Sequence, residues 1–234
     1  MRDFPLDAHE LENFYPAPTK PPPERPWIRA NFATTPNGVV KIDGASKGVS
    51  GPPDREVFAF LRNHCDAVLV GASTARKENY SVPKNLGTAG KAPLLIIVTN
   101  SMDLDDRAQF LDKGSPPLIV TTEQSLSKHL SRIDSFSDKA TVITFGRESV
   151  DFRELLSYLR SQGIGLLLCE GGPQIFSQLL TQGLVDELCL TISPRIGPGE
   201  PSGIVNIGNR PQIEMSLASF FEVDGYLFCR YLAG

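Results

Sequence analysis

The most informative segment for chemistry is the junction Glu170-Gly171-Gly172-Pro173, which follows the apolar run Leu166–Cys169. A short apolar run is typical of a buried strand, and ligands of parallel sheets bind just beyond the carboxyl ends of strands. Adjacent glycines let a backbone approach a ligand, and Pro173 suits the first position of a helix whose N-terminus favours phosphate. We therefore expect Glu170 to project into a site, although an ordinary strand-turn-helix junction has the same pattern.

Two further segments carry polar groups that suit a ligand. Gly71-Ala72-Ser73-Thr74 follows the apolar run Ala67–Val70, and its hydroxyls and glycine amide can meet a phosphate or a nicotinamide. The loop from Asn37 to Ser50 contains polar side chains that can line a substrate pocket, namely Ser46, Lys47 and Ser50. Taken alone, the first segment is also a simple helix cap, and the second is also a solvated surface loop.

Other kinds of active site have little support in the sequence. The Rossmann glycine fingerprint is missing, because Gly163-Ile164-Gly165 precedes its strand instead of following it, and no GxxxxGK[ST] loop occurs. No cysteine belongs to a CxxC pair, so we expect the free thiols of a reduced protein. The three histidines are scattered, which argues against a histidine metal site or a Ser-His-Asp triad. These residues are Cys65, Cys169, Cys189 and Cys229, and His9, His64 and His129.

Charge and hydropathy limit the range of partners. The chain has 234 residues and a formal net charge of −4, with no run of Lys and Arg, so we expect no nucleic-acid partner. No stretch approaches the ~20 apolar residues of a membrane helix, and we expect no membrane association. The N-terminal residues lack the apolar segment of a signal peptide, which predicts a cytoplasmic protein.

Residues 1–26 are predicted to form a Pro-rich N-terminal arm, and residues 27–234 the body. Seven of the 19 prolines fall in the arm. Asp7 followed by Glu10 predicts a short capped helix over Leu6–Phe14, and the Pro-rich piece after it should be extended. The arm can pack either on the body or on a partner subunit.

The body alternates between strand-like and helical patterns, which predicts an α/β protein with a mainly parallel sheet. A helix capped by Asp54 should run to about Asn63, with Val57, Phe58 and Leu61 on its buried side. The predicted strands are 27–34, 39–42, 67–70, 94–98, 118–120, 141–145, 166–169 and 187–192, with helical or loop segments at 105–111, 124–133 and 152–162. Asp224-Gly225 then predicts an antiparallel hairpin between the runs 214–223 and 226–231.

An ordered set of short motifs resembles the reductase domain of the riboflavin-biosynthesis enzymes, from about residue 25 to the C-terminus. Each motif is weak alone, and the order and spacing of the set make the resemblance specific. The motifs are Arg25-Pro26, Thr35-Pro36-Asn37-Gly38, Leu61-Arg62, Asp66–Thr74, Glu170-Gly171-Gly172-Pro173, Val185-Asp186-Glu187, and Ile192-Ser193-Pro194 with Gly197 and Gly199.

The resemblance implies a dihydrofolate-reductase-like fold, usually a homodimer, that uses NADPH. The implied reaction opens the sugar of a phosphorylated ribosylamino-pyrimidine and reduces ribose C1 to give a ribitylamino group. Mapped by motif, the catalytic candidates are Glu170 and Asn37, and the substrate candidates are Asn31, Ser46, Ser50 and Arg62, with Ser46, Ser50 and Arg62 on the sugar phosphate. The coenzyme candidates are Gly71, Thr74, Gly171 and Gly172, with Thr99, Ser101, Thr121, Gly146 and Arg147 after strands where an adenosine 2′-phosphate can be held.

Two positions depart from the family pattern. Asn37 replaces the Asp of the first turn, and Glu78-Asn79-Tyr80 replaces the Asp-Asp-Pro that commonly follows the threonine. An amide cannot transfer a proton, so we expect Asn37 to orient a sugar hydroxyl and Glu170 to carry the acid-base or polar role. A dihydrofolate reductase-type enzyme acting on a pteridine and a non-catalytic nucleotide-binding protein remain alternatives. The pyrimidine can be aminated or deaminated, and no HxE or PCxxC motif supplies zinc deaminase chemistry.

Overall fold

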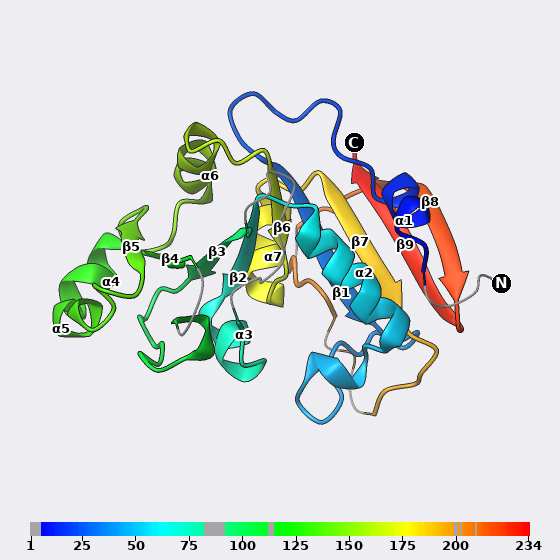
Figure 1. Cartoon of the computed structure of the whole chain (residues 1–234), viewed down its shortest axis with the longest axis horizontal. Coiled ribbons are helices and arrows are strands. Elements are labelled where there is room, and N and C mark those ends of the chain that lie inside the picture. Colours follow the sequence, from blue (N-terminus) through cyan, green and yellow to red (C-terminus); the bar gives the residue numbers. More distant parts are fainter. Residues whose placement is uncertain (1–5, 82–91, 112–114, 199–200, 202, 209) are drawn as a thin grey trace. The chain divides into compact units, whose positions relative to one another are not determined.

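The structure is a computed structural model of the whole chain (Figure 1). It describes residues 6–81, 92–111, 115–198, 201, 203–208 and 210–234. The chain forms two compact units. Unit 1 comprises residues 1–19, 28–64 and 169–234, and unit 2 comprises residues 20–27 and 65–168. Gly199 of the family motif lies outside the described residues.

Unit 2 is built on parallel strands, as the alternating pattern predicts. The strands are β2 (Ala67–Gly71), β3 (Leu94–Val98), β4 (Leu118–Thr121), β5 (Thr141–Thr144) and β6 (Leu166–Cys169), in the spatial order β5-β4-β3-β2-β6. The pairs β2–β3, β3–β4 and β4–β5 are all parallel. Most residues of β2, β3, β4 and β6 are buried, so their apolar runs form the core of this unit. The predicted bounds of these strands are confirmed to within one or two residues.

The helices of unit 2 follow its strands. They are α3 (Ala72–Lys77), η2 (Gln109–Leu111), α4 (Glu123–Lys128), α5 (Leu130–Asp134) and α6 (Phe152–Ser161). Asp151 caps α6 by accepting the backbone N–H groups of Arg153 and Glu154. The helix then buries four apolar side chains that recur at helical spacing, Phe152, Leu155, Leu156 and Leu159.

Unit 1 contains the antiparallel part of the fold. Its strands are β1 (Trp27–Thr34), β7 (Glu187–Ile192), β8 (Met215–Val223) and β9 (Tyr226–Ala233), in the order β1-β7-β9-β8. β1 pairs with β7 in parallel, and the other two pairs are antiparallel. Asp224 and Gly225 both have positive φ, at 52° and 78°, as a tight hairpin turn requires. The predicted mixed sheet and its C-terminal hairpin are confirmed.

The helices of unit 1 are α1 (Ala8–Phe14), η1 (Ser46–Gly48), α2 (Pro52–Asn63) and α7 (Pro173–Thr181). α1 and α2 lie on the same face of the β1-β7-β9-β8 strands (Figure 1). Residue Phe176 of α7 packs on Phe32 of β1, with the ring centroids 4.7 Å apart.

Two local predictions in unit 1 are wrong. Val39–Ile42 is not a strand, because the chain turns back on itself: the Thr35 hydroxyl accepts the Val39 N–H at 2.9 Å, and Ile42 only bridges Ala45. Asp54 is not the cap of α2, which begins at Pro52 after Gly51. Proline suits the first turn of a helix, so α2 starts three residues earlier than a helix capped by Asp54 would.

The buried face of α2 also differs slightly from the prediction. Val57 and Leu61 are buried as expected, but Phe58 is only half-buried and Phe60 is buried. The half-buried Phe58 ring instead makes a cation–π contact with the guanidinium of Arg62, whose Cζ lies 4.3 Å from the ring centroid.

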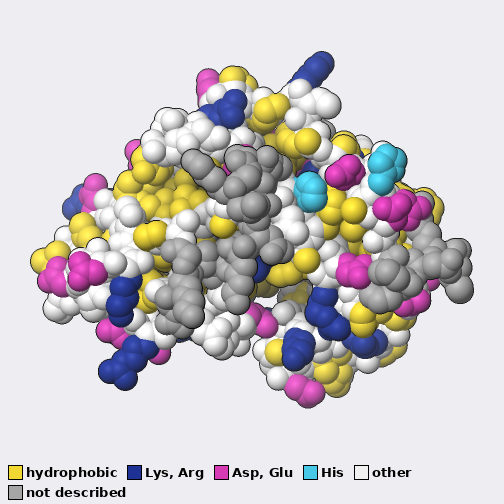
Figure 2. All heavy atoms as spheres, in the orientation of Figure 1, with side chains coloured by type: hydrophobic (Ala, Val, Ile, Leu, Met, Phe, Trp, Pro, Cys, Tyr) yellow, Lys and Arg dark blue, Asp and Glu magenta, His cyan; other side chains and the backbone are white. Residues whose placement is uncertain are grey.

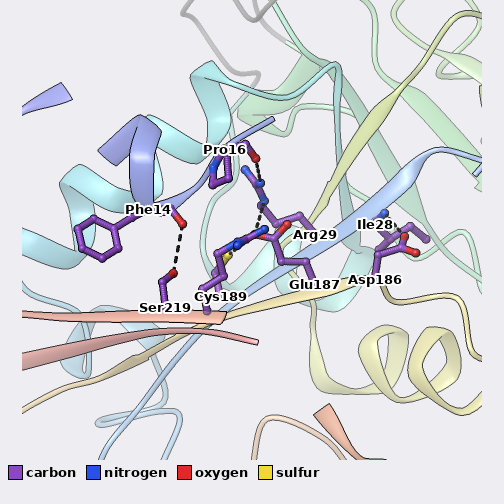
Figure 3. Close-up of polar contacts among 9 residues, drawn as sticks. Phe14, Pro16, Ile28, Arg29, Asp186, Glu187, Cys189 and Ser219 are labelled. Atoms are coloured by element: carbon purple, nitrogen blue, oxygen red, sulfur yellow. Dashed lines mark hydrogen bonds and ion pairs between the residues drawn. The ribbon is translucent and has the colours of Figure 1, made fainter. Parts of the chain in front are cut away.

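The described part of the arm contains the predicted helix. Asp7 accepts the backbone N–H of His9 at the start of α1, which confirms the predicted cap. Tyr15 is buried, between Phe60 of α2 and Phe221 of β8. The Ser219 hydroxyl donates to the Phe14 carbonyl at 3.4 Å (Figure 3). Residues 6–15 therefore pack on the rest of unit 1 in the same chain.

A buried ionic cluster lies beneath the arm and consists of Arg29, Glu187, Arg230 and Cys189. Arg29 and Glu187 are 1% and 0% exposed, and Arg29 Nε lies 2.9 Å from Glu187 Oε1. The same carboxylate oxygen accepts Arg230 Nε at 2.7 Å and the Cys189 thiol at 3.5 Å. Arg29 also donates through Nη2 to the Pro16 carbonyl of the arm at 2.7 Å (Figure 3). Since a buried charge is costly unless it is paired, Arg29 and Glu187 depend on each other.

The described helices include none that is both long and apolar enough to cross a membrane. On the face drawn in Figure 2, Lys and Arg side chains are interspersed with Asp and Glu.

Candidate active site

The carboxylate of Glu170 follows directly after β6 and forms a bidentate ion pair with Arg62. Arg62 lies in the last turn of α2. Its Nε donates to Oε1 at 2.7 Å and its Nη2 donates to Oε2 at 2.6 Å. The two parallel hydrogen bonds use both carboxylate oxygens as acceptors, in the planar geometry that suits a guanidinium. Glu170 is therefore held in one orientation as an acceptor.

Exposure differs between the two partners of this pair. The Glu170 side chain is 2% exposed, whereas that of Arg62 is 18% exposed. Arg62 thus reaches solvent while it holds the carboxylate. The sequence predicted that Arg62 contacts a substrate phosphate, and this stays a prediction. The structure shows that Arg62 also orients Glu170.

The Gly171-Gly172 turn approaches an aromatic ring closely. Gly171 has φ +88°, and a Cβ built on it would lie 3.0 Å from the ring of Phe32. The peptide bond between the two glycines is cis. Gly172 precedes α7 without a side-chain cap, and Pro173 occupies its first turn as predicted. Only glycine fits the φ of position 171, so the turn brings the backbone after β6 close to β1.

Both polar atoms of Asn37 have partners in the protein. Its Oδ1 accepts the Thr35 hydroxyl at 2.7 Å and the Gly197 N–H at 3.1 Å. Its Nδ2 donates to the Gly197 carbonyl at 2.9 Å. An aspartate could not donate this last bond, so the replacement of the family Asp by Asn suits the link to Gly197. Asn37 ties the first turn to the loop that follows β7.

The other substrate candidates lie in unit 1 at different depths. Ser46 and Lys47 belong to η1 and are exposed, Ser50 is half-buried, and Val49 between them is fully buried. Asn31 is half-buried in the middle of β1, in register with Cys189 of β7.

The coenzyme candidates of unit 2 all follow strands, as expected. Gly71 ends β2 and precedes α3, in which Thr74 is half-buried. Thr99 follows β3, and its hydroxyl accepts the N–H of the exposed Ser101 at 3.3 Å. The Thr99 hydroxyl thus shapes its own loop.

Three of these candidates lie together at the ends of β4 and β5. Phe145 donates its N–H to the Thr121 carbonyl, and the carbonyls of Gly146 and Arg147 accept the N–H groups of Glu123 and Gln124. Gly146 has φ +75°, and a Cβ there would lie 2.2 Å from the Ser149 carbonyl, so only glycine fits. The Thr121 hydroxyl is buried and has no hydrogen-bond partner among the described residues. The Arg147 side chain is exposed.

One open cavity in unit 2, of about 390 Å³, was not predicted from the sequence. It is lined by Arg76, Asp103, Leu104, Asp105, Asp106, Arg132 and Ser135. Its two arginines are engaged within the wall, since Arg76 pairs with Asp103 and Arg132 donates to the Leu104 carbonyl. The described residues hold no cluster of three or more His, Cys, Asp or Glu side chains that fits a metal ion.

The family model of the RibD C-terminal domain matches residues 26–224. The chain belongs to this family. It is 29% identical over 177 residues to the 2,5-diamino-6-ribosylamino-4(3H)-pyrimidinone 5′-phosphate reductase of Methanothermobacter thermautotrophicus, covering 75% of this chain and 81% of that protein. A crystal structure of a pyrimidine reductase-like protein from Corynebacterium diphtheriae matches with TM-score 0.78 and 25% identity, over 97% of this chain and 99% of that one.

The dihydrofolate-reductase-like fold expected for the RibD C-terminal domain is also confirmed. Dihydrofolate reductase from Enterococcus faecalis matches with TM-score 0.50 and 14% identity, over 88% of this chain and 96% of that one. At this identity the match concerns the fold alone.

Sequence reasoning missed the pairing of Arg29 with Glu187 and the role of Arg195. The Arg29–Glu187 pair had a signal, because each charge interrupts or opens an otherwise apolar strand, and such a charge is seldom buried without a partner. Arg195, whose side chain contacts the end of η1 and the residues after it, had no signal beyond its place after the Ser-Pro motif.

Proposed function

We propose that this protein is an NADPH-dependent reductase that converts a phosphorylated ribosylamino-pyrimidine to its ribitylamino product in riboflavin biosynthesis. The observation that carries the proposal is the Arg62–Glu170 pair at the Glu-Gly-Gly junction of the family. The reductase name of the Methanothermobacter relative supports the same reaction.

The reaction needs a charged acceptor near the sugar, a grip on the 5-phosphate and a bound hydride donor. Glu170, oriented by Arg62, can accept a hydrogen bond from a sugar hydroxyl or from a water that carries the proton of ring opening. The exposed side of Arg62 and the hydroxyls of Ser46 and Ser50 can hold the phosphate. Asn37 acts in this proposal by fixing the first turn, since its amide is engaged with Gly197.

Unit 2 has features that fit a nicotinamide dinucleotide, which supplies the hydride when bound. The Thr121 hydroxyl has no partner among the described residues at the end of β4, and the exposed Arg147 follows β5 beside it. An arginine there suits the 2′-phosphate that distinguishes NADPH from NADH. We propose that Gly71, Thr74, Thr99, Ser101 and Gly146 of the same unit line the rest of the coenzyme site.

The deciding experiment is NADPH oxidation by the purified protein with the aminated and the deaminated phosphoribosylamino-pyrimidine. Turnover of either supports the proposal and identifies the substrate. Turnover of dihydrofolate alone would assign a pteridine reductase instead, and no turnover with any of them would favour a non-catalytic nucleotide-binding protein.

A variant tests the choice of coenzyme. Arg147→Gln should weaken NADPH binding by about 10- to 150-fold, the equivalent of 1.5–3 kcal/mol for a charge-assisted contact, and leave NADH binding unchanged. Arg107→Gln is the matched control, because Arg107 is an exposed arginine of the same unit. Equal affinity of the wild type for NADPH and NADH would exclude a 2′-phosphate site.

We also propose a homodimer that uses the β8 edge. Phe228 of β9 is 1% exposed, whereas Leu217 and Phe220 of β8 are 51% and 63% exposed. Exposed apolar side chains on an edge strand favour pairing with another chain. Sedimentation at micromolar concentration should give a dimer, and Phe220→Glu should give a monomer.

A cytoplasmic location is part of the proposal. All four cysteines are buried free thiols, which is compatible with a reducing compartment.

A further inference from the structure

The loop that follows β7 contacts two separate parts of the segment that leads into α2. Gly197 of this loop exchanges two hydrogen bonds with Asn37, and a Cβ on Gly197 would lie 2.7 Å from the Val39 side chain. Arg195 of the same loop contacts the end of η1. The loop therefore holds both sides of the stretch that carries Ser46.

Arg195 binds three consecutive backbone carbonyls. Its Nη1 lies 3.1 Å from the Gly48 oxygen, 3.2 Å from the Val49 oxygen and 2.9 Å from the Ser50 oxygen. Carbonyls at the end of a short helix lack hydrogen-bond donors within the helix, and the guanidinium of Arg195 supplies a donor to these three.

Packing fixes the inner side of the same stretch. Val49 is fully buried, and a Cβ built on Gly51 would lie 2.0 Å from the hydroxyl of Tyr226. The guanidinium of Arg195 lies 5.8 Å from the centroid of the Tyr226 ring. Residues 48–51 thus run between a buried aromatic side chain and an exposed cation, and Arg195 alone among these contacts is a side chain that can be altered without disturbing the core.

We propose that Arg195 is a positioning residue that presets the loop of Ser46 and Ser50 for the anionic sugar phosphate of the substrate. This inference rests on the proposed function. A loop fixed before binding loses less conformational entropy when it closes on a ligand, so its ordering raises affinity without a direct contact. Arg195 acts through the backbone of Gly48, Val49 and Ser50.

The first measurement needs no ligand. Hydrogen exchange should increase about tenfold or more at the Val49 and Ser50 amides in Arg195→Gln, because both N–H groups donate to the Ser46 carbonyl within the held turn. Arg195→Lys, which keeps the charge but lacks the planar fork, should fall between the wild type and Arg195→Gln. Arg210→Gln is the control, since Arg210 is also exposed and its side chain donates to the Thr181 carbonyl in the same unit.

The second measurement is the dissociation constant of the phosphoribosylamino-pyrimidine by calorimetry. We expect about tenfold weaker binding to Arg195→Gln, partial rescue in Arg195→Lys, wild-type binding in Arg210→Gln, and unchanged NADPH affinity in all three. Substrate binding equal to wild type in Arg195→Gln overturns the inference, whether or not exchange in the loop increases. If the wild-type protein itself binds no phosphoribosylamino-pyrimidine, both the proposed function and this inference are overturned. If the wild type binds it and Arg195→Gln binds it equally well, the inference alone is overturned.

Discussion

Two arginine–glutamate pairs lie in unit 1 and differ in how far each is sealed from solvent. Arg29 and Glu187 are 1% and 0% exposed, beneath an arm whose Pro16 carbonyl accepts from the arginine. In the Arg62–Glu170 pair the carboxylate is 2% exposed, but the arginine is 18% exposed. Both side chains of the first pair are shielded from solvent, whereas the arginine of the second pair is partly exposed to it.

The two pairs also differ in how the arginines bind the carboxylate. Glu187 receives Arg29 and Arg230 on one oxygen, in addition to the Cys189 thiol. Glu170 receives one arginine on both oxygens, in a planar bidentate pair. A carboxylate shared by two cations holds elements together, whereas one oriented by a single arginine is suited to receive a ligand. The comparison therefore separates a structural pair from a site pair within one unit.

Glu170→Gln should have the largest effect, a loss of about 10²- to 10⁴-fold in kcat. Glutamine keeps the shape but presents an N–H to one donor of Arg62, which removes both the charge and the orientation. Glu170→Asp keeps the charge and should retain more activity. Steady-state kinetics measure the loss, and wild-type kcat together with wild-type NADPH affinity in Glu170→Gln would refute a role for Glu170 in the reaction.

Glu187→Gln should act on stability instead. It leaves the buried Arg29 without its counterion, which should lower the free energy of unfolding by about 3–5 kcal/mol in urea titrations. Glu12→Gln is the control, because the Glu12 side chain is 60% exposed and lies 3.8 Å from His64. A change of about 0.5 kcal/mol is the most we expect there. If Glu187→Gln were as mild as the control, the sealed pair would not be structural.

Arg62→Ala should have an intermediate effect on substrate affinity. Loss of a charge-assisted phosphate contact should raise the KM for the pyrimidine by about 10- to 150-fold, equivalent to 1.5–3 kcal/mol, with NADPH affinity unchanged. The dephosphorylated pyrimidine riboside is the control substrate. An equal rise in KM with that substrate would mean that Arg62 acts only through Glu170, and an unchanged KM with both substrates would leave it a structural partner.

A buried cysteine neighbours each carboxylate, and Cys169 should give the smallest effect. Burial, reinforced by the charge of Glu170, raises the pKa of Cys169 from 9.0 to about 12. The unfolded thiol ionises near its ordinary pKa while the folded one stays neutral, so this contribution to stability is full below about pH 9 and is lost between about pH 9 and 12. Urea unfolding should show a loss of about 1 kcal/mol between about pH 8 and 10.

Cys169→Ala removes that titration and should reduce the loss. The slope should not vanish, because burial and the charge of Glu187 also raise the pKa of Cys189. An identical pH dependence in Cys169→Ala and the wild type would contradict the assignment.

The sequence predicted the elements of this fold better than the contacts between them. Trp27–Thr34, the Asp7 cap and the Asp224-Gly225 turn depend on local spacing and backbone preference, and all three are confirmed. The prediction of a strand over Val39–Ile42 was wrong because the Thr35 hydroxyl accepts the Val39 N–H and closes a turn. Hydrophobic periodicity does not reveal such a turn.

The site shows the same division. Glu170 and Arg62 were both selected from motifs, yet nothing in the local sequence predicts that they bind each other across 108 positions. The three contacts of Arg195 span 145 to 147 positions and were missed entirely. Side-chain pairing between distant segments depends on register, which only the assembled sheet defines.

The parallel pairing of β1 with β7 has a consequence for how the chain folds as it is made. Arg29 lies in register with Glu187, so β1 leaves the ribosome long before its partner strand. Most of unit 2 comes from one uninterrupted stretch, residues 65–168, whose strands can pair as they emerge. Arg29 therefore has no Glu187 to pair with while residues 65–168 are being synthesised. We expect arrest of translation before residue 187 to yield a nascent chain in which the strands β2 to β6 resist protease and residues 6–64 do not.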